Sequence, residues 1–283
     1  MTNGEKTILV TGATGKQGGA VLRHLDGKGF RLRAMTRKPA GEPARALAAR
    51  GIEVVEGDLD DGASVTRALK GAWGVFAVQN TWEAGVEKEE EQGKRIAHLA
   101  REHGVQHFVY TSVGSAHLQT GIPHFENKWR VEEAVRGLNF PSHVIIRPVF
   151  FMENLTTPWF LQGDKLMTAM KPETVLQMIA VDDVGKFGAL AFVQHDRMNG
   201  QELDIAGDAA TMPRVAELLG AAQGKRIEFV PVPIEAIRKN SADTALMLEW
   251  FDRGGYSVDI PKLERTYGLP LTKLDAWTRQ QVR

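Results

Sequence analysis

The densest set of residues able to do chemistry lies near the start of the chain. Residues 8–19 read Ile-Leu-Val-Thr-Gly-Ala-Thr-Gly-Lys-Gln-Gly-Gly, an apolar run followed by glycines spaced Gly-x-x-Gly-x-x-Gly. Gly12 permits a tight turn, Gly15 lets the backbone approach a pyrophosphate, and Gly18 lets a following helix pack closely on the strand. Free amides at a helix N-terminus bind anions. The segment therefore predicts dinucleotide binding. Further contacts are expected from Thr14, Lys16 and Gln17.

The residues after the second apolar run distinguish NADP(H) from NAD(H). A protein that binds NAD usually carries an acidic residue there, which binds the ribose 2′-hydroxyl. This chain has Thr-Arg-Lys at residues 36–38 and no acid. Arg37 can form a charge-assisted pair with a 2′-phosphate, and Lys38 adds positive charge. The alternative is that both are ordinary loop cations. We expect the cofactor to be NADP(H).

Polar residues also follow the third and fourth apolar runs. Asp58 could accept a hydrogen bond from the adenine amino group while Leu59 packs on the ring; alternatively, Asp58 only forms a turn. Gln79 and Asn80 end the fourth run. Ligands of open α/β folds lie at the carboxyl edge of the sheet, where these residues are expected.

The elements that would position these residues alternate regularly. Helix-like segments separate short apolar runs, so the pattern predicts a parallel sheet with helices on both faces. The fold class is therefore α/β, a doubly wound parallel Rossmann sheet with a smaller, mixed α/β C-terminal lobe. The predicted strands are 7–11, 31–36, 52–56, 73–78, 107–111 and 143–147, and the predicted helices are 18–25, 43–49, 62–69, 88–102 and 124–136.

After Pro148 the alternation of apolar runs and helix-like segments becomes irregular. We predict an NADP(H)-binding domain at residues 1–150 and a smaller lobe for substrate or partner at residues 151–283. The strands and helix within 175–206 are expected to return to the first domain. Residues 150–171 are rich in aromatic residues and methionine, and they either line a hydrophobic pocket or form core.

Composition excludes several classes of protein. The chain has 283 residues, with 35 Lys and Arg balanced by 35 Asp and Glu, and no cysteine. It therefore lacks disulfides, cysteine nucleophiles and sulfur-ligated zinc. Zero net charge argues against direct nucleic-acid binding. The chain shows no apolar leader and no membrane-length apolar stretch. We expect a cytoplasmic protein without a metal site, in which the acidic residues 87–91 form the solvated first turns of a helix.

Taken together, these residues resemble the NmrA-like group of atypical short-chain dehydrogenase/reductases. The resemblance covers essentially the whole chain. It rests on the glycine loop with Arg37, Asp58 and Lys128, on Glu-Gln-Gly-Lys at residues 91–94, and on Phe-Met-Glu-Asn-Leu at residues 151–155. It implies an extended Rossmann fold in which Lys128 contacts the cofactor. It also implies cofactor contacts from Phe151, Met152, Glu153 and Asn154.

The usual catalytic tyrosine of that superfamily is missing. Its ordinary members use Tyr-x-x-x-Lys on a helix with a serine on the preceding strand, but none of the three tyrosines here is followed by lysine four residues later. His124 takes the tyrosine's position before Lys128. A histidine can donate a proton at neutral pH, and Ser112 is its candidate hydrogen-bonding partner. The alternative is that His124 is a surface or capping residue.

Two functions follow from this pattern. The first, which the missing tyrosine favours, is a regulatory protein that senses nucleotide or redox state and reports to a protein partner. The second is an NADPH-dependent reductase of quinones or other small aromatic or carbonyl substrates, in which Lys128 acts. The sequence leaves a homodimer open in both cases.

Overall fold

The computed structural model describes residues 3–281 of the chain, which form two compact units. The first unit contains the residues up to Val113 together with Glu126–Arg147 and Val184–Leu203. The second contains Gly114–Phe125, Pro148–Asp183 and the residues from Asp204 onward. The chain thus alternates between the units rather than completing one before starting the other.

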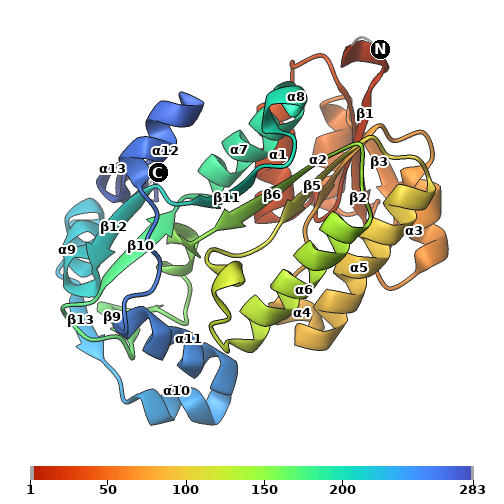
Figure 1. Cartoon of the computed structure of the whole chain (residues 1–283). Helices are drawn as coiled ribbons and strands as arrows, with labels where there is room; N and C mark the ends of the chain where they lie inside the picture. The colour runs from red at the N-terminus through yellow and green to blue at the C-terminus, as the bar shows by residue number, and fades with distance from the viewer. Residues whose placement is uncertain (1–2, 282–283) are drawn as a thin grey trace. The chain divides into compact units, whose positions relative to one another are not determined.

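The first unit is built on a seven-stranded sheet with the order β11-β6-β5-β4-β1-β2-β3 (Figure 1). Strands β1 to β6 pair in parallel, with β1 between β4 and β2. This arrangement confirms the predicted doubly wound α/β fold, because a helix connects each of the strands β1 to β5 to the next parallel strand. The strands are β1 (Thr7–Val10), β2 (Arg31–Thr36), β3 (Glu53–Glu56), β4 (Gly74–Ala77), β5 (His107–Thr111), β6 (Ser142–Pro148) and β11 (Glu202–Ile205).

Helices cover both faces of this sheet. Apolar residues of α3, α5 and α6 share one core cluster with Leu9, Phe108 and Ile145 of the strands, whereas α1 and α7 lie on the opposite face (Figure 1). The strands are apolar on both sides because both sides are buried. The helices are α1 (Lys16–Leu25), α2 (Glu42–Ala49), α3 (Gly62–Leu69), α4 (Thr81–Ala84), α5 (Val86–Glu102), α8 (His195–Met198) and most of α6 (Pro123–Gly137) and α7 (Val181–Val193).

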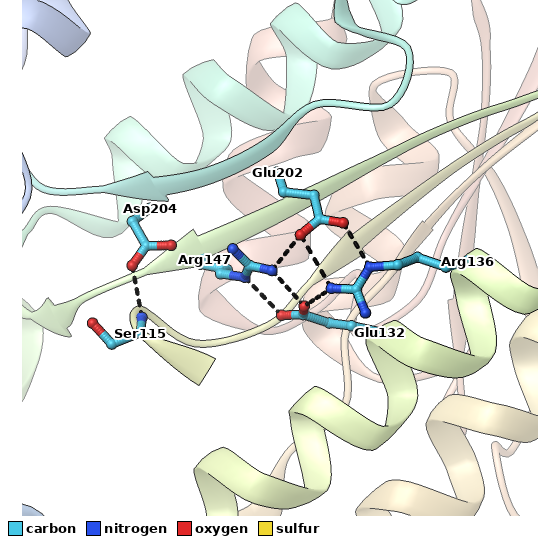
Figure 2. Close-up of polar contacts among 6 residues, drawn as sticks. All are labelled: Ser115, Glu132, Arg136, Arg147, Glu202 and Asp204. Atoms are coloured by element: carbon cyan, nitrogen blue, oxygen red, sulfur yellow. Dashed lines mark hydrogen bonds and ion pairs between the residues drawn. The ribbon is translucent and has the colours of Figure 1, made fainter. Parts of the chain in front are cut away.

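A buried network of charges joins α6, β6 and β11 (Figure 2). Arg147 donates two hydrogen bonds to Glu132, at 2.9 and 2.6 Å, and also contacts Glu202. Arg136 bonds both carboxylates, and its guanidinium stacks on Trp129, 4.2 Å from the ring centroid. Glu132 is fully buried and Arg147 is 5% exposed. Since a buried charge is tolerated only when it is paired, this network fixes the sheet edge in one arrangement.

The second unit contains two three-stranded sheets, β12-β10-β7 and β13-β9-β8. Its core includes a cluster of aromatic rings, in which the ring centroid of Tyr256 lies 5.1 Å from that of Trp250 and 5.3 Å from that of Phe251. Its elements are β7 (Phe150–Phe151), β8 (Leu161–Gln162), β9 (Lys165–Thr168), β10 (Val175–Ile179), β12 (Asp208–Thr211), β13 (Glu228–Pro231), α9 (Met212–Gln223), α10 (Ile234–Asn240), α11 (Ala242–Asp252), α12 (Ile260–Tyr267) and α13 (Leu274–Gln280).

The strand expected to return to the large sheet near Val175 does not do so. It forms β10, which pairs antiparallel with β12 and parallel with β7 in the second unit. Helix α7 from Val184 and the first half of β11, Glu202 and Leu203, belong to the first unit. In the aromatic-rich segment 150–171, Phe150 and Met170 are buried, whereas Trp159 is 81% exposed. Within residues 3–281, no helix combines the length and apolar character needed to cross a membrane.

Candidate functional site

The glycine segment forms the turn between β1 and α1. Gly12 has a φ of 56°, a conformation that glycine adopts at little cost. The Gly15 amide then donates to the Gly12 carbonyl at 2.9 Å, and α1 begins at Lys16. In the described structure no side chain caps this helix at Gly15. The turn therefore presents the start of α1 as a place where an anion can bind the backbone amides.

The space around the loop explains why glycine is required. A Cβ on Gly18 would lie 2.4 Å from the Gly12 carbonyl oxygen, and one on Gly15 would lie 3.2 Å from the same atom. By contrast, a Cβ on Gly19 would come no closer than 3.5 Å to Ala13. A Cβ on Gly12 would also lie 2.7 Å from Cγ1 of Val78, so all three glycines of the sequence pattern are closely packed.

Side chains at the strand ends hold the loop in place. The Thr11 hydroxyl accepts from the Val78 amide at 2.8 Å, just beyond β4, and donates to the Val78 carbonyl at 3.0 Å. Thr111, at the end of β5, donates to the Gln17 amide oxygen at 2.8 Å. Gln17 is thus fixed by the sheet, whereas Thr14 and Lys16 are exposed at the mouth of the loop.

Several buried polar atoms of the first unit lack a partner. Among residues 3–281, both side-chain polar atoms of Gln79, the Ser112 hydroxyl and the Asn127 carboxamide oxygen have no hydrogen bond, although all three residues are less than 9% exposed. Gln79 and Ser112 follow β4 and β5 at the carboxyl edge of the sheet. An unsatisfied buried polar group costs about 1–3 kcal/mol. Such groups at a ligand-binding edge are consistent with a polar ligand that satisfies them.

Arg37 follows β2, but its guanidinium is not free. It forms an ion pair with Glu83 of α4, and both side chains are more than half exposed. This hydrogen bond raises the pKa of Arg37 above its ordinary value, and the nearby carboxylates of Asp58 and Asp60 act in the same direction. Lys38 is exposed.

The other expected contacts after β3 and β4 also have local roles. The Asp58 carboxylate accepts from the Asp60 amide at 3.0 Å, which is the turn given above as the alternative to an adenine contact. Leu59 packs against the core beneath α3 and α5. Asn80 caps α4 by accepting from the Trp82 amide at 3.2 Å.

Glu89 is the main feature that the sequence interpretation missed. It lies in the first turn of α5, where the acidic residues 87–91 are expected to be solvated, yet it is 1% exposed. Its carboxylate accepts from the Lys128 ammonium at 2.6 Å and from the Asn127 amide at 2.8 Å, and it also contacts the Thr81 hydroxyl. The expectation is therefore wrong for Glu89, because its partners on α6 and α4 make its burial favourable.

This cluster is electrostatically balanced. Burial raises the pKa of the Glu89 carboxyl, but the Lys128 ammonium and the hydrogen bonds from Thr81 and Asn127 outweigh burial, so the pKa lies below its ordinary value. Lys128 is 11% exposed along its side chain. The arrangement holds an ionised carboxylate against a cationic amine in a largely buried position, and such pairs are enriched at functional sites.

His124 has a different partner from the one expected. Its Nδ1 lies 2.7 Å from the Asp243 carboxylate of α11, in the second unit, and the residue is 6% exposed. Ser112, the partner expected from the sequence, has no hydrogen bond from its hydroxyl within the described chain. The pairing of Ser112 with His124 stays a prediction, since the two residues belong to different units. Asp243 lies 119 positions away in sequence and left no local signal.

The remaining expected contacts, Phe151 to Asn154, belong to the second unit. Met152 is fully buried, and the Glu153 carboxylate accepts from the Val181 amide at 3.0 and 3.1 Å. Phe151 and Asn154 are half-buried. These contacts show that Met152 and Glu153 stabilise the unit that contains them.

Comparison with known proteins places this arrangement in context. The chain is 26% identical over 277 residues to an NmrA-like family domain-containing protein of Dictyostelium discoideum, covering 89% of this chain and 90% of the other. It is 28% identical over 254 residues to the NmrA-like family domain-containing oxidoreductase FrzB of a Cladobotryum species, covering 80% and 76%.

Two solved structures share the fold. The Citrobacter sp. triphenylmethane reductase complexed with NADP(H) superimposes with a TM-score of 0.81 at 21% identity, covering 98% of this chain and 100% of the other. NmrA, a negative transcriptional regulator in complex with NAD, gives a TM-score of 0.81 at 20% identity, covering 98% and 95%. The sequence profile of the NmrA-like family matches residues 4–280, nearly the whole chain. The protein therefore belongs to the NmrA-like family.

Proposed function

We propose that this protein is an NADP(H)-dependent reductase of small aromatic or carbonyl substrates. The nucleotide part of the proposal rests on the first unit. The glycine turn offers backbone amides at the start of α1, and Cβ atoms at Gly15 and Gly18 would fill the space that the turn uses. Arg37 lies at the end of β2, where an arginine suits a 2′-phosphate. The unsatisfied groups of Gln79 and Ser112 fit a polar ligand at the carboxyl edge. These residues fit a bound dinucleotide.

The names of similar proteins support this class of cofactor and reaction. The reductase from Citrobacter was crystallised with NADP(H), and an NADPH-dependent quinone oxidoreductase of Escherichia coli with NADPH. FrzB and several further curated relatives are named oxidoreductases. The proposal extends that class of activity to this chain.

The observation that carries the reductase proposal is the buried pair of Glu89 and Lys128. When bound, NADPH supplies a hydride to the substrate, and the reduced product then needs a proton. The Lys128 ammonium can donate that proton, and Glu89, 2.6 Å from Nζ, holds the amine in position. The pair thus offers an acid in a protein that lacks the tyrosine of ordinary short-chain dehydrogenase/reductases. For this reason we favour a reductase over the sensing function that the sequence favoured.

The test combines binding and turnover. Calorimetric titration of NADP⁺ and NAD⁺ measures the nucleotide preference, and quinone-dependent NADPH oxidation measures turnover. We expect Arg37→Ala to weaken NADP⁺ binding more than tenfold while NAD⁺ binding changes little, since a charged hydrogen bond is worth about 1.5–3 kcal/mol. Lys128→Ala should abolish turnover while NADP⁺ still binds. The matched control is Lys94→Ala, which removes a partly exposed lysine paired with Glu90 on α5. Full turnover in Lys128→Ala would contradict the proposal.

A sensing regulator remains the second candidate, and the tyrosines favour it. Tyr110 is completely buried, and burial raises its pKa well above the ordinary value. Burial raises the pKa of Tyr256 in the same way. Neither phenol can replace the missing proton donor. A sensor predicts tight NADPH binding without turnover on any quinone or carbonyl, together with a change in protease sensitivity or oligomeric state when the nucleotide binds.

A further inference from the structure

Arg37 is held by a carboxylate at the position where the proposed function requires it to bind a phosphate. Its Nη2 pairs with Oε1 of Glu83, which lies 46 positions later on α4. The two side chains are 57% and 54% exposed, so a ligand from solvent can reach both. A guanidinium binds a phosphate best through two parallel N–H groups, and Glu83 occupies one of these donors.

The carboxylates around Arg37 oppose a second anion. Besides Glu83, the carboxylates of Asp58 and Asp60 are close enough to raise the pKa of Arg37. Lys88 does not offset them, because its amine lies 2.8 Å from Asp60 and is already paired. A 2′-phosphate that approaches Arg37 therefore meets three carboxylates, of which only Glu83 bonds the guanidinium directly.

Two of the side-chain contacts of helix α4 bear on this site. Glu83 bonds Arg37, and Thr81 bonds Glu89. The helix is only four residues long and is followed by Gly85 at a φ of 88°. Trp82, between the two contacts, is 67% exposed. Replacing Glu83 by a phosphate at Arg37 would remove one of the two contacts and change the surroundings of Trp82.

We propose that Glu83 is a specificity-determining residue, which competes with the cofactor 2′-phosphate for Arg37. Glu83 lowers the affinity for NADP(H) but not for NAD(H), and binding of the 2′-phosphate releases α4 from Arg37. The two classes of dinucleotide thus leave α4 in different states. The inference rests on the proposed NADP(H) binding, but it holds for a reductase and for a sensor alike.

The test uses Glu83→Gln, which removes the charge and keeps the shape. The matched control is Glu87→Gln, an exposed glutamate of α5 that contacts none of these residues in the described ion pairs. Calorimetry should show NADP⁺ binding strengthened about two- to fivefold in Glu83→Gln, the range that exposed ion pairs allow. NAD⁺ affinity should stay unchanged, and Glu87→Gln should match the wild type for both.

A second readout follows α4 itself. Trp82 fluorescence, taken as the difference between wild type and Trp82→Phe, should change with NADP⁺ and stay constant with NAD⁺. The inference is overturned if wild type and Glu83→Gln bind NADP⁺ with equal affinity. It is also overturned if Glu83→Gln raises the affinities for NADP⁺ and NAD⁺ equally. Neither result would contradict NADP(H) binding itself. A wild type that binds neither dinucleotide overturns the proposed function and the inference together.

Discussion

Replacing Glu89 with glutamine separates charge from shape at the centre of the proposed site. The glutamine could still accept hydrogen bonds from Thr81 and Asn127, but the Lys128 ammonium would lose its counter-charge. Lys128 is only 11% exposed, so solvent compensates for the lost counter-charge only in small part. Removing one partner of a buried ion pair costs about 3–5 kcal/mol. Because part of the hydrogen bonding remains and Lys128 retains some exposure, we expect the lower end, about 3 kcal/mol.

This free energy converts into a measurable change of melting temperature. At about 2.1 cal/mol/K per residue, unfolding a chain of 283 residues carries an entropy of about 0.6 kcal/mol/K, so Glu89→Gln should lower Tm by about 5 °C in scanning calorimetry. The double variant Glu89→Gln with Lys128→Met removes both charges. It should recover most of the loss, since replacing a buried pair by uncharged groups is often neutral.

The control is Glu90→Gln on the same helix. Glu90 pairs with Lys94 and Arg130 at a partly exposed position, where a pair is worth about 1 kcal/mol or less, so its Tm should fall by less than about 2 °C. A double variant at least as unstable as the sum of its single variants would refute the reasoning, because it would show that Glu89 and Lys128 do not compensate each other. A Tm for Glu89→Gln within about 1 °C of wild type would refute it as well.

Three further predictions test other features of the first unit. Gly18→Ala should abolish NADP⁺ binding measured by calorimetry, because its Cβ would lie 2.4 Å from the Gly12 carbonyl oxygen, whereas Gly19→Ala, with 3.5 Å to its nearest neighbour, should bind normally. Burial lowers the pKa of His107 to about 3, so below about pH 6.5 only the unfolded chain takes up this proton. The free energy of unfolding then falls by up to about 1.4 kcal/mol for each unit by which the pH decreases. Urea unfolding between about pH 6 and pH 4.5 measures this slope, and the contribution of His107 should be absent in His107→Asn. Glu132→Gln should reduce the free energy of unfolding in urea by about 3–5 kcal/mol because it leaves the buried Arg147 undercompensated, and an unchanged urea midpoint would contradict that role.

Much of the first unit could be predicted from the sequence because its signals are local. The glycine spacing at residues 12–18 specifies a turn and a helix start within seven positions, and α3 at Gly62–Leu69 lies where its pattern predicts it. The parallel pairing of the strands follows from repeated strand-helix-strand units. In the second unit, strands as short as Leu161–Gln162 pair without a periodic pattern, which is why they were not predicted.

The side-chain partners were harder to predict because they come from distant segments. Asp243 meets His124 across 119 positions, and Lys128 meets Glu89 across 39. Glu89 nevertheless had a detectable signal. It shares the spacing of the buried face of α5, where Gln92, Gly93, Ile96, Ala97 and Ala100 are also buried. An acidic residue at a helix position that faces the core indicates that a charged or hydrogen-bonding partner lies buried beside it.

The position of β11 at the edge of the large sheet affects how the protein is made. Strand β6 and its Arg147 leave the ribosome before Glu202, which completes their charge network 55 residues later. At a translation rate of roughly 5–20 residues per second, the edge of β6 stays unpaired for about 3–11 s before β11 has been synthesised. Throughout that interval the nascent chain presents an open strand edge beside an incompletely compensated arginine. Chaperone dependence and aggregation on overexpression should therefore concentrate in this window, and faster translation of the intervening segment should shorten it.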